Sequence, residues 1–550
     1  MCGIVGFIGK TEAAPILLDG LSKLEYRGYD SAGLVVYGEE DGIQVAKAKG
    51  RLRVLMDLTQ GGATLHGVAG LGHTRWATHG EPSDINSHPH VSEQGRFAVV
   101  HNGIIENYAE LREFLERKGV HFASETDSEV VAQLLEYNHK GDLLETIERT
   151  LQQLRGAYAL GILCADHPDK LVAVRKDSPL ILGHGEDFQM LASDVTAVIK
   201  YTRDVTYLDN EELAVITGQG FQVYDSYVQP VEKKLHHVDW EISAAEKGGY
   251  EHFMAKEIME QPEAFRKTAF PRIRDGQVVL DDLCFDKEYL KDMDKIYIIA
   301  CGSSYHVGMV AKYNFEKLLR KPVEVALASE FRYCDPIVTK KTLALIISQS
   351  GETIDTLTAM REAKRLGARV LSIVNVVGST IARESDDVLY TWAGPEIAVA
   401  TTKAYSTQLA LTYLVALYFA GLMETIGKED YTAIVSELLL IPTKLERIIE
   451  QRDNVQYFAS LYFNQPSIFF MGRNIDYAVG LEGSLKLKEI SYIHSEAYAA
   501  GELKHGTISL IEPGTLVVAL GSYQPLFEKV MSNIVEVKSR GANVLGVTAQ

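Results

Sequence analysis

A ten-residue segment that recurs in similar form in the second half of the chain constrains the fold more than any other feature. Residues 362–371 read Glu-Ala-Lys-Arg-Leu-Gly-Ala-Arg-Val-Leu, and residues 536–545 read Glu-Val-Lys-Ser-Arg-Gly-Ala-Asn-Val-Leu. Self-similarity of this kind is typical of duplicated structural units. The sequence therefore predicts two copies of one sheet domain in this half of the protein.

Each copy alternates apolar strands, turns rich in glycine and serine, and helices. Strands are expected at residues 296–300, 343–347, 370–374 and 388–391 in the first copy, and at 467–471 and 516–520 in the second, with a helix at 482–490. This alternation is typical of a doubly wound parallel sheet. We expect residues 496–506 to form an irregular loop and the second copy to stop just after its third strand.

The first 220 residues have a different pattern, in which strand-like runs outnumber those of one parallel array. The runs lie at 3–8, 33–37, 69–73, 97–101, 157–163, 171–174 and 213–216, and helical patterns lie at 13–24, 105–118 and 127–138. Packed antiparallel sheets flanked by helices fit this pattern best. A further helix at 250–265 is expected to end near Pro262. The predicted segments are a first domain at 1–220, a linker and helix at 221–285, and sheet domains at 286–427 and 455–550.

The first residues, Met1-Cys2-Gly3, place a thiol at the second position. If Met1 is removed, Cys2 carries a thiol and a free α-amine, whose pKa is ~7.7–8.0. An amine of this kind can take the proton of a nucleophile on the same residue. Cys2 alone is equally compatible with a small buried residue at the start of a strand.

Polar clusters at the ends of the first-domain strands suggest what Cys2 could act on. An amide substrate develops an oxyanion when a thiol attacks it, and Asn102 with the Gly103 N–H could stabilise that charge. Arg75 can pair with an α-carboxylate, and Asp127 can hold an α-ammonium. These groups together describe a glutamine site. Taken singly, each has a structural alternative: Asp127 as a helix N-cap, Asn102-Gly103 as a turn, and Arg75 stacked on its neighbour Trp76.

Five motifs in this half resemble the class II glutamine amidotransferase family. They are Cys2-Gly-Ile-Val-Gly, Arg27-Gly-Tyr-Asp-Ser-Ala-Gly, His73-Thr-Arg-Trp-Ala-Thr-His-Gly, His101-Asn-Gly and Glu125-Thr-Asp-Ser-Glu. The resemblance implies an N-terminal-nucleophile αββα sandwich with Cys2 as nucleophile and Asn102 and Gly103 as the oxyanion hole. It also implies that glutamine is bound by Arg27, Arg75, Trp76, Thr78, His79 and Asp127.

The second half contains a predicted anion site at Ser348-Gln-Ser-Gly-Glu-Thr353, between a strand and a helix N-terminus. Hydroxyls, backbone N–H groups and the positive end of the helix dipole favour a phosphate there. The absence of a Walker lysine disfavours a nucleoside triphosphate. A well-capped helix after a tight turn is the alternative. Lys486 and Glu489 share a helix face and can act in one place, or form a surface ion pair.

Five segments of the second half resemble the two sugar isomerase (SIS) domains of the glucosamine-6-phosphate synthase family. They are Cys301-Gly-Ser-Ser, Ser348-Gln-Ser-Gly-Glu-Thr, Val399-Ala-Thr-Thr-Lys, Leu485-Lys-Leu-Lys-Glu-Ile-Ser-Tyr-Ile-His and Gly501-Glu-Leu-Lys-His-Gly. Together with the first half, the resemblance covers essentially the whole chain. It implies that ammonia from Cys2 travels inside the protein, past Trp76, to fructose 6-phosphate. Glu489 would move a proton between C1 and C2, His505 would open the ring, and Lys486 would complete the catalytic set. The residues implied for sugar phosphate binding are Cys301, Gly302, Ser303, Ser304, Ser348, Gln349, Ser350, Thr353, Val399, Ala400 and Thr401.

The sequence departs from the family at its end. The resemblance implies a C-terminal tail that closes the sugar site and supplies a lysine, and this tail is absent from the sequence. The second sheet domain is therefore expected to be truncated at Gln550, and we expect glutamine hydrolysis without amino-sugar synthesis. A glutaminase fragment and a phosphosugar-binding protein are alternatives. A phosphoribosyl or glutamate-synthase type amidotransferase is a further alternative, which the doubled sheet domain disfavours.

Composition limits the partners. The formal net charge of −19 argues against a general nucleic-acid binder. The five cysteines contain no Cys-x-x-Cys pair, so neither a disulfide framework nor a metal cluster is expected. No apolar run reaches the ~18 residues of a membrane span, and no secretory signal begins the chain. We expect a cytoplasmic homodimer that needs no cofactor or metal.

Overall fold

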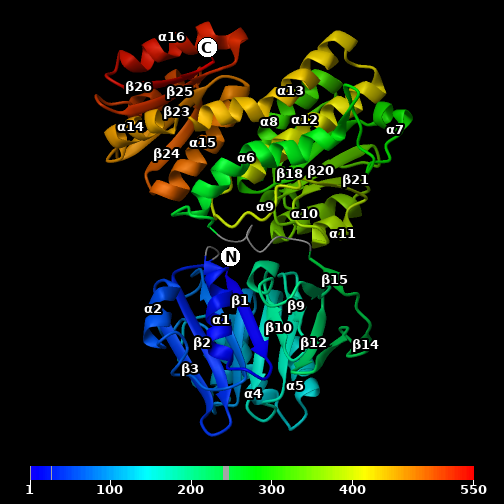
Figure 1. Ribbon diagram of the computed structural model, residues 1–550, viewed down its shortest axis with the longest axis vertical. Helices are drawn as coiled ribbons and strands as arrows, with labels where there is room; N and C mark the ends of the chain where they lie inside the picture. The colour runs from blue at the N-terminus through cyan, green and yellow to red at the C-terminus, as the bar shows by residue number, and fades with distance from the viewer. Residues whose placement is uncertain (1, 26–27, 239–246, 550) are drawn as a thin grey trace. The chain divides into compact units, whose positions relative to one another are not determined.

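The computed structural model describes residues 2–25, 28–238 and 247–549 (Figure 1). The chain divides into two compact units, residues 1–246 and 247–550. Each unit has its own sheets and its own hydrophobic cores, and each is described by itself below.

The first unit contains two antiparallel sheets packed face to face. The eight-stranded sheet has the order β15 (His236–His237), β11 (Asp204–Tyr207), β9 (Ile181–His184), β10 (Gln189–Ala192), β1 (Gly3–Ile8), β4 (Ala69–Arg75), β2 (Ser31–Gly38) and β3 (Gly42–Lys49). The seven-stranded sheet has the order β14 (Pro230–Val231), β13 (Gly220–Tyr224), β12 (Glu212–Thr217), β8 (Leu171–Lys176), β7 (Gly156–Cys164), β6 (Phe97–Ile105) and β5 (His90–Val91).

Helices cover the outer faces of both sheets, so the unit is the expected αββα sandwich. Helices α1 (Ala13–Ser22) and α2 (Leu52–Leu58) pack on the larger sheet, and α3 (Tyr108–Glu116), α4 (Glu129–Asn138) and α5 (Leu143–Leu151) pack on the other. Both faces of strand β1 are apolar, because each packs into a different hydrophobic core. Ile4 and Ile8 face the opposite sheet, whereas Val5 and Phe7 join the cluster under α1, because successive side chains of a strand point to opposite faces.

The second unit contains two parallel sheets of the same topology. The five-stranded sheet has the order β19 (Val323–Leu327), β18 (Lys295–Ala300), β20 (Thr342–Ser348), β21 (Arg369–Val374) and β22 (Asp387–Tyr390). The four-stranded sheet has the order β24 (His494–Ala499), β23 (Ser467–Gly472), β25 (Leu516–Gly521) and β26 (Asn543–Thr548). In each copy the chain runs from the first strand to one neighbour and then crosses to the other side, which confirms the duplication.

Two strands of the second unit differ from the sequence expectation. Strand β19 was not expected, and β24 lies where an irregular loop was expected, so the second sheet has four strands in the described chain. Both are edge strands, and most of their residues are only partly buried. They lack the continuous apolar run that identifies a central parallel strand.

The helices of the second unit are α6 (Phe253–Ala269), α7 (Lys287–Asp292), α8 (Gly302–Leu319), α9 (Ala328–Phe331), α10 (Ile354–Arg365), α11 (Thr380–Glu384), α12 (Lys403–Met423), α13 (Lys428–Ile449), α14 (Arg452–Tyr462), α15 (Ile475–Ser491) and α16 (Phe527–Lys538). Helix α12 is long and apolar enough to cross a membrane by length and composition, but 67% of its apolar window is buried inside the structure. It contacts α6 and α8, as a core helix does.

Helix α6 does not end near Pro262 as the sequence suggested. It continues through Pro262 to Ala269. Proline cannot donate to the carbonyl four residues earlier, which belongs to Ile258. The Gln261 side chain supplies the missing donor, with Nε2 3.2 Å from that carbonyl oxygen.

The boundary between the two units falls inside the segment 221–285, which the sequence assigns to a linker and helix. Strand β13 pairs with β12, and β15 pairs with β11, so both belong to the first unit. Helix α6 contacts α12 and α13 and belongs to the second.

Candidate functional sites

Cys2 lies directly before β1, next to the end of β4. The register pairs Gly3 with Thr74, so Cys2 comes beside the backbone of Arg75 and Trp76. The Trp76 N–H donates to Cys2 Sγ at 3.2 Å. Burial raises the pKa of the Cys2 thiol, and the hydrogen bond from Trp76 partly offsets this effect. The resting side chain is therefore a thiol that needs a base before it can attack.

Asn102 reaches Cys2 from the other sheet. Its Nδ2 donates to the Cys2 carbonyl oxygen at 3.0 Å. The turn alternative for Asn102-Gly103 is wrong, because β6 continues without a break to Ile105. Gly103 has φ of +126°, and a Cβ there would lie 2.0 Å from the Ala157 carbonyl oxygen. Only glycine fits this position of the strand.

Asp127 is not the N-cap of α4. The cap position is Ser128, which makes no side-chain cap hydrogen bond. The buried Asp127 carboxylate instead accepts from the Ile105 N–H at 2.8 Å. Asp127 is thus tied to the end of the strand that carries Asn102.

Arg75 is 3% exposed and holds the loop that follows β4. Its Nη2 donates to the carbonyl of Gly80 at 3.1 Å and to that of His79. It also lines the cavity at Cys2. That cavity is lined by Cys2, Arg75, Trp76, Thr78, His79, His88, His101, Gly103, Thr126, Asp127 and Ser128.

The structure thus brings the expected glutamine-site residues together, with one exception: Arg27 lies outside the described residues. Trp76 is 41% exposed, and its ring packs edge to face against Tyr29. Among the described contacts, the alternative in which Arg75 stacks on Trp76 does not occur. Thr78 Oγ1 lies 3.3 Å from His79 Nδ1.

Sequence reasoning missed two residues that organise this site. Asp30 accepts from the Ala77 N–H at 2.8 Å and so fixes the segment after Trp76. His73 lies 3.0 Å from the Asn102 side-chain oxygen. Both stand inside motifs quoted above, but the sequence contains no sign of their contacts.

The second candidate site lies at the carboxyl ends of β18 and β20. The chain leaves β18 toward β19 on one side and returns to β20 on the other, and such a switch point is where open parallel sheets bind ligands. Cys301, Gly302, Ser303 and Ser304 follow β18, and Ser348–Thr353 follows β20. Ser348 Oγ accepts from the Gly351 N–H at 3.1 Å and lies 3.3 Å from Thr353 Oγ1. Both hydroxyls are therefore held at the start of α10.

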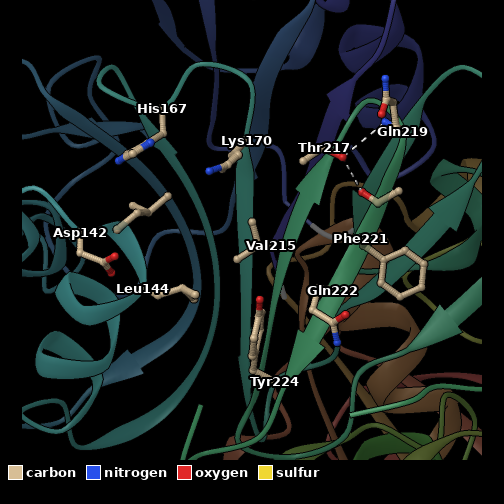
Figure 2. Close-up of a pocket in the computed structure, with 12 residues that line it drawn as sticks. Asp142, Leu144, His167, Lys170, Val215, Thr217, Gln219, Phe221, Gln222 and Tyr224 are labelled. Atoms are coloured by element: carbon tan, nitrogen blue, oxygen red, sulfur yellow. Dashed lines mark hydrogen bonds between the residues drawn. The ribbon is translucent and has the colours of Figure 1, made fainter. Parts of the chain in front are cut away.

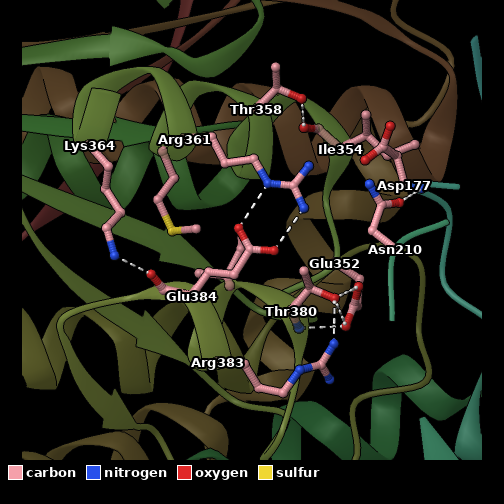
Figure 3. Close-up of polar contacts among 12 residues, drawn as sticks. Asp177, Asn210, Glu352, Ile354, Thr358, Arg361, Lys364, Thr380, Arg383 and Glu384 are labelled. Atoms are coloured by element: carbon pink, nitrogen blue, oxygen red, sulfur yellow. Dashed lines mark hydrogen bonds and ion pairs between the residues drawn. The ribbon is translucent and has the colours of Figure 1, made fainter. Parts of the chain in front are cut away.

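Helix α11 is hydrogen-bonded to the loop 348–353 and to α10, the helix that follows this loop (Figure 3). The Glu352 carboxylate accepts from the Thr380 N–H at 2.7 Å. Arg361 on α10 forms two hydrogen bonds with Glu384, of 2.8 and 2.7 Å.

The segment 396–402 is fixed by two carboxylates. Glu396 accepts from the Thr402 N–H at 2.8 Å and from the Thr401 hydroxyl. Glu257 on α6 accepts from the N–H groups of Ile397 and Ala398, at 2.5 and 3.1 Å. Within this segment Val399 is exposed and Ala400 is buried.

Lys486 links the second sheet domain to the first copy's site. Its Nζ donates to Ser303 Oγ at 3.0 Å and pairs with Glu489. His505 is exposed in a short 3-10 turn, Leu503–His505. Among the described residues, no hydrogen bond or ion pair joins its side chain to Lys486 or Glu489.

A cleft of about 510 Å3 lies elsewhere in the first unit, between α5 and the β12–β13 hairpin (Figure 2). His167, Lys170, Phe221 and Tyr224 line it, and none of the residues predicted for either site does. The part of the chain that the structure describes contains no cluster of three or more side chains able to hold a metal ion.

The fold and the site at Cys2 define a class II glutamine amidotransferase joined to a pair of sugar isomerase domains. The family model "Glutamine amidotransferase domain" matches residues 73–200, and the model "SIS domain" matches residues 289–418 and 461–550. The C-terminal domain of glucosamine-fructose-6-phosphate aminotransferase from Francisella tularensis is 39% identical, with a TM-score of 0.54 over 55% of this chain and 85% of that chain.

Relatives match the chain over its whole length. It is 54% identical to the glutamine–fructose-6-phosphate aminotransferase (isomerizing) of Clostridium acetobutylicum, with 100% of this chain and 90% of that protein covered. It is 47% identical to the enzyme of the same name from Thermus thermophilus, with the same coverage. The chain belongs to the glutamine–fructose-6-phosphate aminotransferase (isomerizing) family.

Proposed function

We propose that this protein hydrolyses glutamine at Cys2 and transfers the ammonia to fructose 6-phosphate, forming glutamate and glucosamine 6-phosphate. The observation that carries the proposal is the meeting of Cys2, directly before β1, with Asn102 on β6 of the other sheet and with Asp127 in the segment before α4. The chain is 54% identical to an aminotransferase of this name over its full length.

In the first half-reaction, Cys2 Sγ attacks the carboxamide carbon of glutamine. Once Met1 is removed, the α-amine of Cys2 takes the thiol proton, which burial holds on the sulfur in the resting state. Asn102 Nδ2 and the Gly103 N–H stabilise the oxyanion. The protonated amine then gives this proton to the amide nitrogen, the C–N bond breaks, and ammonia leaves as the thioester forms; water then hydrolyses the thioester and releases glutamate. Arg75 and Asp127 bind the α-carboxylate and α-ammonium of the substrate, and Arg27, Trp76, Thr78 and His79 surround it.

In the second half-reaction, the hydroxyls at the start of α8 and α10 hold the sugar phosphate. Support comes from the fixed positions of Ser348 and Thr353 at the switch point. Gln349, Ser350, Ser304 and the segment Val399–Thr401 complete the pocket, together with Cys301 and Gly302. Glu489 moves the proton between C1 and C2, Lys486 orients it through their ion pair, and His505 opens the sugar ring.

Ammonia passes from the first site to the second inside the protein, with Trp76 at the entrance. The protein acts as a cytoplasmic homodimer. Light scattering of the purified protein tests the dimer, and loss of synthesis with retained glutamine hydrolysis in Trp76→Ala tests the passage.

The decisive experiment measures glutamate and glucosamine 6-phosphate in the same assay. The wild-type protein should form both, and Cys2→Ala should lose glutamine-dependent formation of both by at least ~10³-fold, because the nucleophile is gone. The 54% identity over the whole chain favours this coupled reaction over a glutaminase or a phosphosugar-binding protein. It also favours the coupled reaction over the expectation, stated from the sequence, of glutamine hydrolysis without amino-sugar synthesis. Hydrolysis without any amino sugar would support those alternatives.

A further inference from the structure

Four histidines are packed together at the Cys2 site, and two of them, His88 and His101, line its cavity. His73, His88, His90 and His101 are each at most 4% exposed, and the ring centroids of His73 and His88 are 4.1 Å apart. Burial lowers the pKa of all four. Each ring is therefore neutral and carries a single N–H, on either Nδ1 or Nε2.

The hydrogen bonds of His73 settle its tautomer. Its Nε2 lies 3.0 Å from the His101 carbonyl oxygen and 3.0 Å from Asn102 Oδ1. Both partners are acceptors, so Nε2 must carry the hydrogen. Burial lowers the pKa of His73 to about 3, so Nδ1 stays unprotonated, and Nδ1 has no hydrogen-bond partner among the described residues.

This N–H fixes the orientation of the Asn102 amide. With Oδ1 held by His73, Nδ2 faces the Cys2 carbonyl oxygen at 3.0 Å. The reversed amide would bring its NH2 group against the His73 N–H and its oxygen against the Cys2 carbonyl oxygen. Both contacts are repulsive, so the His73 N–H and the Cys2 carbonyl oxygen together determine which amide atom lies on the Cys2 side.

We propose that His73 is a positioning residue that holds the Asn102 amide with its N–H groups toward the oxyanion. The inference rests on the proposed glutamine hydrolysis and adds a residue to it. His73 does not touch the substrate; it acts through Asn102.

The test compares replacements that keep or remove the Nε2–H donor. His73→Gln retains an amide N–H at about the reach of Nε2, whereas His73→Asn and His73→Leu do not. Loss of an oxyanion donor lowers kcat by ~10²–10³-fold. We therefore expect His73→Leu and His73→Asn to lower kcat for glutamine hydrolysis at least tenfold with KM little changed, and His73→Gln to recover most of the loss.

A second readout separates positioning from folding. The aldehyde analogue of glutamine adds to Cys2 and forms a hemithioacetal with the same oxyanion, so its affinity should fall in parallel with kcat. Alkylation of Cys2 by iodoacetamide forms no oxyanion and should keep its rate. His184→Leu is the matched control, because His184 also makes two hydrogen bonds in the same sheet, to Gln189 and Thr206, both of 2.9 Å.

Wild-type kcat and aldehyde affinity in His73→Leu would overturn the inference. Equal losses in His73→Gln and His73→Asn, or an equal loss in His184→Leu, would overturn it as well. Failure of the proposed function is a separate result, because the wild-type protein would then not hydrolyse glutamine.

Discussion

Ser522 Oγ lies 2.5 Å from Oδ1 of Asp476 and donates a hydrogen bond to it. Asp476 is 2% exposed and stands second in α15, and its other oxygen accepts from the Tyr523 N–H at 2.9 Å. In the first copy the second residue of the corresponding helix, α8, is Ser303. A carboxylate of the protein therefore occupies, in the second copy, the position that corresponds to the Ser303 hydroxyl, which the proposed function assigns to the sugar phosphate site of the first copy.

This relationship predicts one sugar phosphate site per chain. Equilibrium dialysis with fructose 6-phosphate should give one bound molecule per chain, and two equivalent sites would contradict the prediction. Asp476→Ala should leave the Ser522 hydroxyl and Tyr523 N–H unpaired and lower the free energy of unfolding by ~1–3 kcal/mol in urea titrations. Asp453→Ala, at a side chain that is 90% exposed, is the control and should change little.

Gly103→Ala should strongly reduce glutamine hydrolysis. The added Cβ would meet the Ala157 carbonyl oxygen at 2.0 Å, so β6 must shift and carry Asn102 away from Cys2. We expect at least a tenfold fall in kcat/KM, since a displaced oxyanion donor costs ~10²–10³-fold. Gly95 also has a positive φ, of +74°, but an added Cβ there would have nothing within 4 Å, so Gly95→Ala is the control. It should lose only ~1 kcal/mol of stability and keep its activity; equal losses in the two variants would contradict the argument.

Glu257→Gln should change how stability depends on pH. Burial, and then the charge of Glu396, raises the pKa of Glu257 from 4.5 to about 7. Between these values the folded carboxyl holds a proton that the unfolded chain has lost, so this group makes the protein less stable as pH rises. The loss is complete above pH 7 and amounts to about 3 kcal/mol.

The measurement for Glu257 is urea unfolding between pH 5 and pH 8, compared for wild type and Glu257→Gln. The difference in their free energies of unfolding should grow in favour of the variant as pH rises through this range. Glu263→Gln, on the same helix with a side chain 59% exposed, should run parallel to wild type. A pH-independent difference for Glu257→Gln would show that its pKa is not raised.

Arg361→Leu should have a small effect on stability. The two side chains of its pair with Glu384 are 34% and 35% exposed, and ion pairs with this exposure contribute ~0–1 kcal/mol. We expect a fall of at most a few degrees in the melting temperature. The affinity for fructose 6-phosphate should fall more than in Arg365→Leu, whose partner Glu362 lies on its own helix, because Arg361 ties α10 to α11 beside the loop 348–353, where the sugar phosphate is proposed to bind. Identical affinities in the two variants would contradict this role.

Patterns within short segments were enough for much of the fold. The repeat of residues 362–371 at 536–545 predicted two sheets of one topology, and both have it. The apolar runs of the first 220 residues predicted packed antiparallel sheets. Edge strands β19 and β24 were missed because half-buried strands carry no continuous apolar run. Helix α6 continues through Pro262 because the Gln261 side chain donates to the carbonyl that proline leaves without a donor. The general rule that proline ends a helix takes no account of such a side chain.

The sequence by itself determined the chemical groups of this protein: a thiol at position two, an asparagine followed by glycine, and serines and threonines before a helix. Only the tertiary structure decided how these groups face one another. Asn102 points its N–H toward Cys2 because His73, from the other sheet, holds its oxygen. Asp476 lies at the carboxyl end of the second parallel sheet, because Ser522, which follows the neighbouring strand β25, donates a hydrogen bond to it. Local patterns record propensity and periodicity, whereas such contacts join residues far apart in the chain and depend on the packing of whole sheets.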